Sequence, residues 1–451
     1  MIGDAASIAA EAVPQRASLV LPSSGAFDSR AWRIASALAG RGHAVTVLAR
    51  RESGLPEEEM HPAGYRIVRV PVSAVDGLPA PLRAVARRLR RPRAIPPPSA
   101  SAPAVPPTSG GRRGRLLARV RTAGSAGIRL AAIGLTVRSQ RLASRRVAPS
   151  ADLVHAMAYM GIPIGLDLGR RDRAPVVYDA RDIYIDAANI ARLPRAARRL
   201  FGWVERRWAR KASRLVTVNR PYAEVMERRF DVPLPLIIMN CSYRREPPTV
   251  EQRRFHEVLQ LPSTTRVVLY QGGFSRERGI EQLIEALPVF PERTVLALLG
   301  YGVLEGELRR RASAPDVAGR LFVLPAVPPT DLLDWVASAD VVAMPIQPST
   351  LNHRLTTPNK LFEAMAAGVP VVASDLPGMA GIVRATGCGV LCDPTSSAAI
   401  AAAITSILDA PEPARAAFRE RAIAAARGEY SWEAQVEVLL AEYGRLTGRP
   451  W

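Results

Sequence analysis

The 451-residue sequence lacks several features that would each indicate a particular class of protein. Its three cysteines (Cys241, Cys388 and Cys392) are too few for a disulfide framework and favour a reducing compartment. No apolar stretch reaches the roughly 18–20 residues that a membrane-spanning helix needs, and the start of the chain lacks the basic and apolar segments of a secretory signal. Aromatic residues make up only 6%, so the cores must be built from Ala, Val, Leu and Ile. We therefore expect a cytoplasmic protein, with membrane contact possible from one side only.

Lysine is scarce, and acidic residues are absent from one long stretch. Only Lys211 and Lys360 are lysines, although Lys and Arg together number 61 against 41 acidic residues, which gives a net charge of +20. Residues 77–151 contain sixteen arginines and no acidic residue. Within them, 92–113 is rich in Pro, Ser and Gly and is expected to be a loop. The stretch 115–146 alternates Arg with Leu, Val and Ile and is expected to be helical.

Two interpretations of this basic helical stretch stay open. One is a solvated helix pair with a packed inner face, and the other is a patch attracted to an anionic membrane surface. Nucleic acid is disfavoured as a partner, because no aromatic residues interleave with the arginines as stacking platforms.

Two series of alternating strands and helices fill the rest of the chain. The first opens with a strand at 17–22, a turn at 23–25, a helix at 29–39 and a strand at 44–48, as a parallel α/β domain does. The second follows Pro247-Pro248. Its strands are expected at 266–270, 294–299, 321–324, 341–344, 369–373 and 389–391. We therefore predict two doubly wound domains of roughly 200 residues each, with a ligand site at the carboxyl ends of their strands.

The most informative segment is Thr357-Pro358-Asn359-Lys360-Leu361-Phe362-Glu363. Pro358 suits the first turn of a helix, where its missing N–H costs nothing. The free N–H groups of that turn form an anion site, and Lys360 adds a point charge. Glu363, one turn further on, could accept hydrogen bonds from ribose hydroxyls; the alternative is an ordinary surface acid.

Two glycine turns precede this segment. Gly272 and Gly273 let the backbone approach a ligand closely, and Arg278 could supply positive charge for a phosphate, unless it is merely a solvated side chain. The turn 300–306 comes close to the dinucleotide fingerprint. Its third Gly comes one residue late, however, and no acid is placed to hold a ribose, which disfavours a nicotinamide dehydrogenase.

These segments together resemble the donor-binding signature of the family 4 retaining glycosyltransferases, the group 1 glycosyl transferases with the GT-B fold. The resemblance is carried by the segments 356–374, 272–279, 297–302, Ala339-Asp340 and Ser431-Trp432. It implies two Rossmann-like domains that face each other across a cleft, with a last helix that crosses back to the first domain. The expected ranges are 1–245 for the acceptor domain, with an Arg/Pro-rich insert at about 77–150, 246–430 for the nucleotide-sugar domain, and 431–451 for the last helix.

The resemblance also implies roles for single residues. Arg278 and Lys360 neutralise the departing diphosphate and are the catalytic candidates, and Glu363 binds the donor ribose. The other expected donor-site residues are Gly25, Gly272, Gly273, Thr357, Pro358 and Asn359. The acceptor-side candidates are Asp28, Arg30, His155, Arg181 and Asp182. Helix capping is the alternative for Asp28, and a structural role is the alternative for His155.

Three positions depart from the pattern of the family. Leu355 stands where the first of two glutamates is common, and Gly273 stands where a basic residue is frequent. Arg181 replaces a frequent His; it can contact a phosphate or an acceptor but cannot act as a base near neutral pH.

The expected activity is transfer of a sugar from a nucleotide-diphosphate sugar, with UDP favoured by family frequency, to a glycan, lipid-linked or small-molecule acceptor with retention. Cell-envelope polysaccharide synthesis on the inner face of the plasma membrane would suit such an enzyme. Neither a metal nor a cofactor is expected, since no Asp-x-Asp occurs, His and Cys are too sparse for a cluster, and the nucleotide-sugar is a co-substrate. The alternatives are a catalytically degenerate nucleotide-sugar-binding subunit and a glycoside hydrolase, which would need a pair of carboxylates that is not evident.

Overall fold

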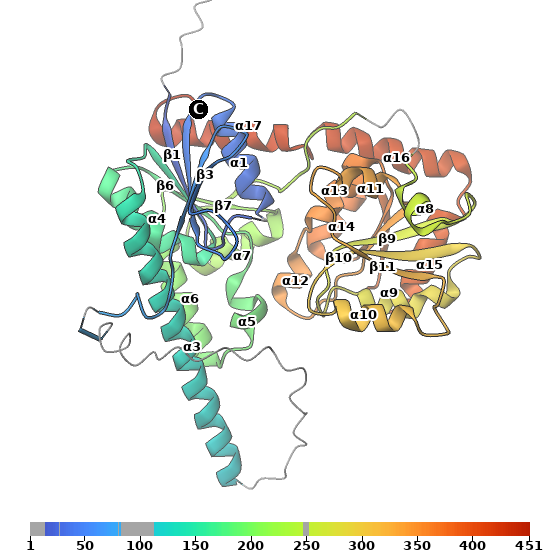
Figure 1. Cartoon of the computed structure of the whole chain (residues 1–451), viewed down its shortest axis with the longest axis horizontal. Helices are drawn as coiled ribbons and strands as arrows, with labels where there is room; N and C mark the ends of the chain where they lie inside the picture. The colour runs from blue at the N-terminus through green and yellow to red at the C-terminus, as the bar shows by residue number, and fades with distance from the viewer. Residues whose placement is uncertain (1–13, 27, 80, 83–111, 247–251) are drawn as a thin grey trace, which may run out of the picture. The chain divides into compact units, whose positions relative to one another are not determined.

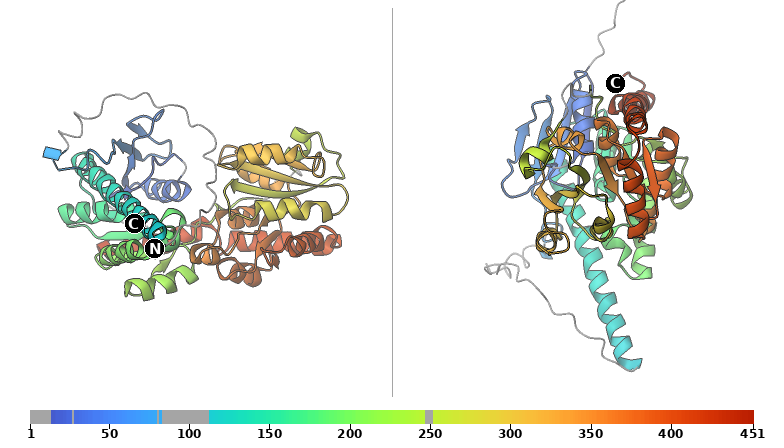
Figure 2. Two further views of the ribbon diagram at one scale, coloured as in Figure 1. Left: turned by 90° about the horizontal axis from the view of Figure 1, so that it is seen from below. Right: turned by 90° about the vertical axis from the view of Figure 1, so that its right-hand side faces the viewer.

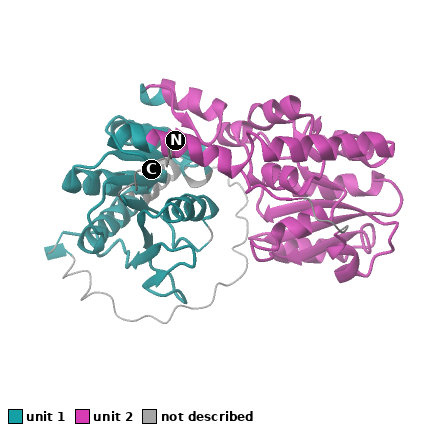
Figure 3. Ribbon diagram, turned by 90° about the horizontal axis from the view of Figure 1, so that it is seen from above, with its two compact units in different colours: residues 1–215, 229–232, 443–451 teal, residues 216–228, 233–442 magenta. Residues whose placement is uncertain are grey.

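The computed structural model describes residues 14–26, 28–79, 81–82, 112–246 and 252–451. The chain divides into two compact units (Figure 3). Unit 1 comprises residues 1–215, 229–232 and 443–451, and unit 2 comprises residues 216–228 and 233–442. Most of the Pro/Ser/Gly-rich stretch expected at 92–113 lies outside the described residues, as do the arginines from Arg83 to Arg93 and Pro247-Pro248.

The first sheet has eight strands in the order β3-β4-β2-β1-β5-β6-β7-β8 (Figure 1). These are β1 Arg16–Val20, β2 Ala44–Arg50, β3 Glu58–Met60, β4 Arg66–Val70, β5 Leu153–Met157, β6 Val176–Asp179, β7 Arg214–Thr217 and β8 Leu236–Ile237. β1 lies between β2 and β5 and is parallel to both, whereas the short β3 runs antiparallel to β4. The accompanying helices are α1 Ser29–Ala39, α3 Arg112–Val147, α4 Ala158–Asp172, α5 Ala188–Ala191, α6 Arg195–Ala209 and α7 Arg220–Phe230.

The second sheet has six strands in the order β11-β10-β9-β12-β13-β14, and all its pairs are parallel. They are β9 Arg266–Gly273, β10 Thr294–Tyr301, β11 Leu321–Pro325, β12 Val341–Met344, β13 Val371–Ser374 and β14 Gly389–Cys392. The helices are α8 Arg254–Leu259, α9 Ile280–Ala286, α10 Glu305–Ala312, α11 Leu332–Ala337, α12 Leu351–Leu355, α13 Asn359–Ala367, α14 Pro377–Thr386, α15 Ser397–Leu408, α16 Glu412–Arg427 and α17 Trp432–Thr447. The prediction of two parallel α/β domains is therefore confirmed.

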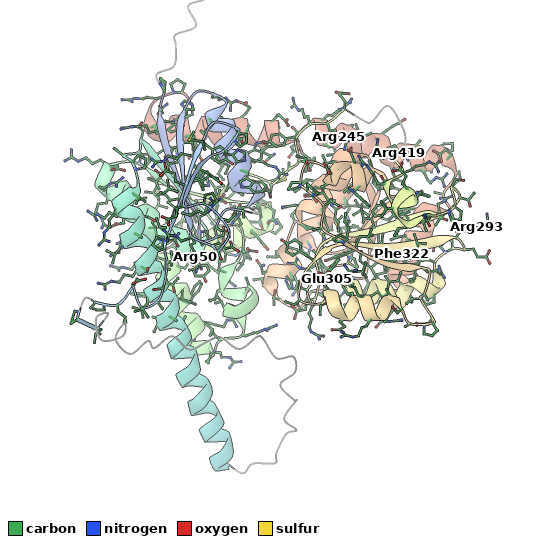
Figure 4. The ribbon with its side chains drawn as sticks, viewed as in Figure 1. Arg50, Arg245, Arg293, Glu305, Phe322 and Arg419 are labelled. Carbon is green, nitrogen blue, oxygen red and sulfur yellow. The ribbon has the colours of Figure 1, made fainter. Side chains whose placement is uncertain are left out.

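Both faces of the second sheet are buried, and alternate residues of β9 enter two different cores. Val267 and Leu269 pack in one cluster with Leu361 of α13. Phe322 of β11, labelled in Figure 4, packs against the same cluster. Val268 lies in the other cluster, with residues of α9 and α15. Side chains of a strand alternate between the two faces, so a strand covered on both sides needs the continuous apolar run found here. β9 lies at the buried centre of this sheet and leads into the turn that carries Arg278.

The basic stretch is helical, as predicted, and forms one continuous helix, α3, rather than the helix pair that one of the two interpretations assumed (Figure 2, teal). Its glycines do not interrupt it, because Gly inside a helix costs only about 1 kcal/mol relative to Ala. The packed inner face is present in its second half, where Val137, Gln140 and Ser144 are buried. The Gln140 side-chain amide donates to the Leu21 carbonyl at 2.6 Å. This half of α3 is thus part of the core of unit 1.

Among the described residues, none of the helices combines the length and the apolar character that crossing a bilayer would require.

Candidate functional site

The start of α13 carries backbone N–H donors, and its first residue, Asn359, is exposed. Pro358 precedes the helix in an extended conformation, and no side chain caps the first turn. The helix ends at Gly368, which has a left-handed φ of 69°. The first N–H groups of a helix have no partner within it, and the helix dipole makes this end attractive to anions. The anion site expected from the Pro-Asn-Lys run therefore has the backbone geometry it requires.

Lys360 lies in the first turn of α13, with its ammonium nitrogen 3.7 Å from the centre of the Tyr270 ring of β9. Its side chain is half-buried. Burial and, to a smaller extent, the charge of Arg278 lower the pKa of Lys360 to about 7, although Glu363 acts in the opposite direction. Within the described ranges, neither Lys360 nor Arg278 forms an ion pair with a carboxylate. In the described part of the chain, two cations near the same helix start are thus not paired with a carboxylate, an arrangement that favours a bound anion.

Glu363 is half-buried and accepts a hydrogen bond from the Gln271 side-chain amide at 2.6 Å. It is therefore not an ordinary solvated surface acid. The amide oxygen of Gln271 is buried and has no hydrogen-bond partner in the described part of the chain. Gln271 was not singled out from the sequence, although its place at the end of a buried strand, before two glycines, is a usable signal.

The end of β9 lies close to the lysine side chain. At Gly272 φ is 118°, and a Cβ built there would lie 3.6 Å from the Lys360 ammonium nitrogen. A Cβ at Gly300 would approach the Gly272 carbonyl oxygen to 2.0 Å. Gly300 therefore allows β10 to pack closely against β9, which is a structural reason for the first glycine of the near match to a dinucleotide fingerprint.

Arg278 is held in place by the residue before it. Glu277 has a φ of 68°, unusual for a residue with a side chain. Its carbonyl accepts a hydrogen bond from the Gln347 backbone N–H at 3.0 Å, and its carboxylate accepts one from the Ser349 hydroxyl at 2.9 Å. The backbone at Gly279 packs closely against Pro345, because a Cβ at Gly279 would lie 2.0 Å from the Pro345 carbonyl oxygen. These contacts fix the turn that carries Arg278. Gly279 belongs to a segment that the resemblance included, whereas Gln347, Ser349 and Pro345 were not predicted.

The segment before α13 is held by buried polar contacts. The Asn219 amide donates to the Leu355 carbonyl at 2.7 Å and to the Thr357 hydroxyl at 3.0 Å. Thr357 in turn donates to the Gly378 carbonyl at 2.6 Å and is buried. The Thr357 side chain is therefore engaged within the protein, and its contribution to ligand binding rests on its backbone. Asn359 is exposed and accepts a hydrogen bond from Asn240 at 2.9 Å.

Among the expected residues of unit 1, Gly25 and Asp28 lie in the turn before α1. Gly25 has a φ of 80°, and its carbonyl accepts a hydrogen bond from the Trp32 indole at 2.7 Å. Asp28 caps α1 by accepting from the Ala31 N–H at 3.1 Å, the alternative given for it. It also pairs with Arg181 at 2.7 Å. Asp182 is half-buried.

Arg30 and His155, expected on the acceptor side, lie in a buried network instead. Arg30 is 1% exposed and His155 is fully buried, so their placement supports the structural role and does not support contact with an acceptor. Arg30 and His155 contact the same oxygen of Asp179, at 2.6 and 3.1 Å. Burial alone would raise the pKa of Asp179, but the charge of Arg30 and the contact with His155 outweigh it and hold that pKa well below its usual range. Tyr443 of α17 completes the network at 2.6 Å from His155.

No group of three or more His, Cys, Asp or Glu side chains is arranged to hold a metal ion within the part of the chain that the structure describes.

The chain matches two family models and several characterised proteins. Residues 251–425 match the glycosyl transferases group 1 model, and residues 25–239 match the glycosyl transferase 4-like domain model. A D-inositol 3-phosphate glycosyltransferase from Xylanimonas cellulosilytica is 32% identical over 197 residues, which cover 43% of this chain and 45% of the relative. A glycogen synthase from Mycobacterium tuberculosis is 32% identical over 158 residues, 34% of this chain and 36% of the relative. These matches thus span less than half the length of the relatives.

Solved structures match over nearly the whole chain. Sucrose-phosphate synthase from Thermosynechococcus elongatus has a TM-score of 0.68 at 20% identity and covers 96% of this chain and 99% of its own. HepE from Anabaena, solved with UDP and glucose, has a TM-score of 0.63 at 17% identity and covers 96% and 100%. Both halves of the chain thus match glycosyltransferase families, and its fold is that of the GT-B glycosyltransferases.

Proposed function

We propose that the chain transfers a glycosyl group from a nucleotide-diphosphate sugar, which it holds at the start of α13 and the turn after β9. The observation that carries the proposal is the pair of cations at this place. Lys360 and Arg278 are close enough to shift the pKa of Lys360, and neither forms an ion pair with a carboxylate in the described part of the chain. Keeping two such cations close together costs free energy unless an anion is bound there for part of the catalytic cycle.

The same cations, together with the start of α13, could also accelerate the transfer reaction. When the bond between the sugar and the diphosphate breaks, negative charge grows on the departing phosphate oxygens. The first N–H groups of α13, Lys360 and Arg278 are fixed beforehand and can stabilise this charge without reorganising. We propose on these grounds that no metal is required. Retention of configuration, with the departing phosphate assisting deprotonation of the acceptor, is proposed from the family resemblance alone.

UDP is the proposed nucleotide, supported by the UDP-bound HepE structure among the structural neighbours. The test is thermal unfolding of the protein with UDP, GDP, ADP and CDP. A diphosphate present at about 100 times its Kd stabilises the folded state by about 2.7 kcal/mol, which corresponds to a rise of several degrees in Tm. We expect UDP to produce this rise and the other three to produce little. An equal response to all four, or none to any, would contradict a specific donor site.

The acceptor is proposed to be a glycan, a lipid-linked sugar or a small molecule, as in cell-envelope polysaccharide synthesis. A binding subunit without activity is the second candidate, because Leu355 stands where the family commonly has a carboxylate. Nucleotide-sugar binding without transfer of labelled sugar to any acceptor extract would favour the subunit.

We also propose that the arginines of the insert attract the protein to the inner face of an anionic membrane. Deleting residues 115–146 would be a poor test, because it would remove the buried Gln140 contact to Leu21. The better variant changes Arg115, Arg119, Arg121 and Arg129 to Gln. We expect it to bind phosphatidylglycerol-containing vesicles more weakly, since each cation near such a surface contributes about 1 kcal/mol.

The matched control for the insert removes four exposed arginines of unit 2, namely Arg293, Arg310, Arg384 and Arg419. Equal vesicle binding by the insert variant, this control and the unmodified protein would argue against the role of the insert.

A further inference from the structure

Helix α6 has an unusual outward face. Its buried residues Phe201, Glu205 and Ala209 recur every four positions and define the side that faces the core. Directly opposite, at the centre of the outer face, stands Trp203, which is 60% exposed. Leu200 beside it is 55% exposed. A helix that only covers a core presents polar side chains outward, so two large apolar residues there call for a partner.

The same face is strongly basic. Five cations are exposed along it: Arg195, Arg199, Arg207, Arg210 and Lys211. The carboxylate of Asp231 pairs with Arg206 and Arg210. Within the described residues, Arg195, Arg199 and Lys211 form no ion pair. The net charge of these side chains therefore stays positive after Asp231 is counted.

Trp203 and the cations also form a shallow open hollow of about 440 Å³. It is lined by Trp203, Arg206, Arg207, Arg210 and Lys211. The Arg207 guanidinium lies 5.9 Å from the centre of the Trp203 ring. An indole bordered by cations offers an apolar surface beside phosphate-binding donors.

We propose that this α6 face binds the surface of an anionic phospholipid bilayer, with lipid phosphates in the hollow and Trp203 and Leu200 entering the headgroup region. Charge complementarity argues for this occupant, because cations at an anionic surface attract it and an exposed Trp prefers the boundary between water and hydrocarbon. The inference is independent of the donor site and of the insert. α6 supplies an apolar anchor as well as charge, and two kinds of attraction are what stable surface binding requires.

The test is flotation of the full chain with vesicles of phosphatidylcholine, with and without phosphatidylglycerol. We expect binding only to the anionic vesicles and weakening by salt. The double variant Leu200→Ser/Trp203→Ser should lose at least about tenfold in affinity, and Arg199→Gln and Arg207→Gln about fivefold each. The matched control, Val289→Ser/Val303→Ser, removes two exposed apolar residues of unit 2 and should leave binding unchanged.

A second readout reports on Trp203 itself. Lipids brominated near the headgroup should quench part of the tryptophan fluorescence of the unmodified protein, and Trp203→Phe should lose that part while still binding.

Equal vesicle binding by the Leu200/Trp203 variant and the unmodified protein would overturn the proposal, as would quenching that is unchanged in Trp203→Phe. Loss of binding in the four-arginine variant of the insert but in no α6 variant would assign the membrane contact to the insert and refute it for α6. Binding to an acidic protein or to nucleic acid, with none to the anionic vesicles, would also refute it.

Discussion

Replacing Glu363 with Ala is expected to weaken binding of the nucleotide donor by about 10- to 100-fold, measured by calorimetric titration. A hydrogen bond to a charged acceptor contributes about 1.5–3 kcal/mol, and a carboxylate can accept from two ribose hydroxyls. In the free protein this carboxylate accepts from Gln271 at 2.6 Å. The ligand must therefore share or replace that contact, and Glu363→Gln should have an intermediate effect.

Nucleotides that lack one ribose hydroxyl test whether Glu363 acts through the ribose. The unmodified protein should prefer UDP to its 2′-deoxy or 3′-deoxy analogue, and Glu363→Ala should bind all three almost equally. Glu285→Ala is the matched control, because Glu285 is an exposed acid on helix α9 of the same unit. If Glu363→Ala kept both the affinity and the preference, Glu363 would not be a ribose ligand.

Lys360 is expected to make donor binding depend on pH. The pKa of Lys360 in the free protein is lowered to about 7 from an ordinary value of 10.5, first by burial and then by Arg278. A bound diphosphate favours the charged ammonium and raises this pKa again. Affinity for a nucleotide-sugar should thus be highest below pH 7 and fall by up to about tenfold per pH unit above it. The diphosphate of a nucleotide-sugar does not itself titrate in this range, so it is a better probe than the free nucleotide.

Proton uptake measures the same effect directly. Calorimetry near pH 8 in buffers of different ionisation enthalpy should show uptake of close to one proton on donor binding. Lys360→Arg is the control, because Arg stays charged and should remove both the uptake and the pH dependence. Lys360→Met should weaken binding at every pH. A flat pH profile in the unmodified protein would exclude Lys360 as the titrating contact.

As the pH rises, the stability of the unliganded protein should increase, whereas its affinity for the donor should decrease. Because the folded-state pKa of Lys360 is below the unfolded-state value, the unfolded chain binds more protons between about pH 7 and 10.5. The unliganded protein should therefore gain stability as pH rises through this window. At pH 7, Lys360→Met should raise Tm while it weakens donor binding, a combination typical of a residue kept for function.

The sequence was a good guide wherever neighbouring residues decide the structure. The buried strands of the second sheet were predicted to within a few residues, since a strand covered on both faces must be an unbroken apolar run. The start of α13 was also predicted, since Pro358 and Gly368 mark a helix start and end through their own backbone preferences. The basic insert was predicted less well. Its arginines gave no signal of which residues pack inward, and the buried Gln140 was not recognised.

The sequence by itself thus determined that two parallel α/β domains form, and it predicted an anion site with one lysine and one arginine in the second. Only the tertiary structure decided the pKa values and the hydrogen-bond partners of those groups. Arg278 lowers the pKa of Lys360 across 82 residues of sequence, and Gln271 bonds Glu363 across 92. It also showed that Arg30 and His155 share the buried Asp179. The physical reason is the same in each case. Backbone preferences act over a few residues, whereas the pKa and the hydrogen-bond partner of a side chain depend on groups that only folding brings near it.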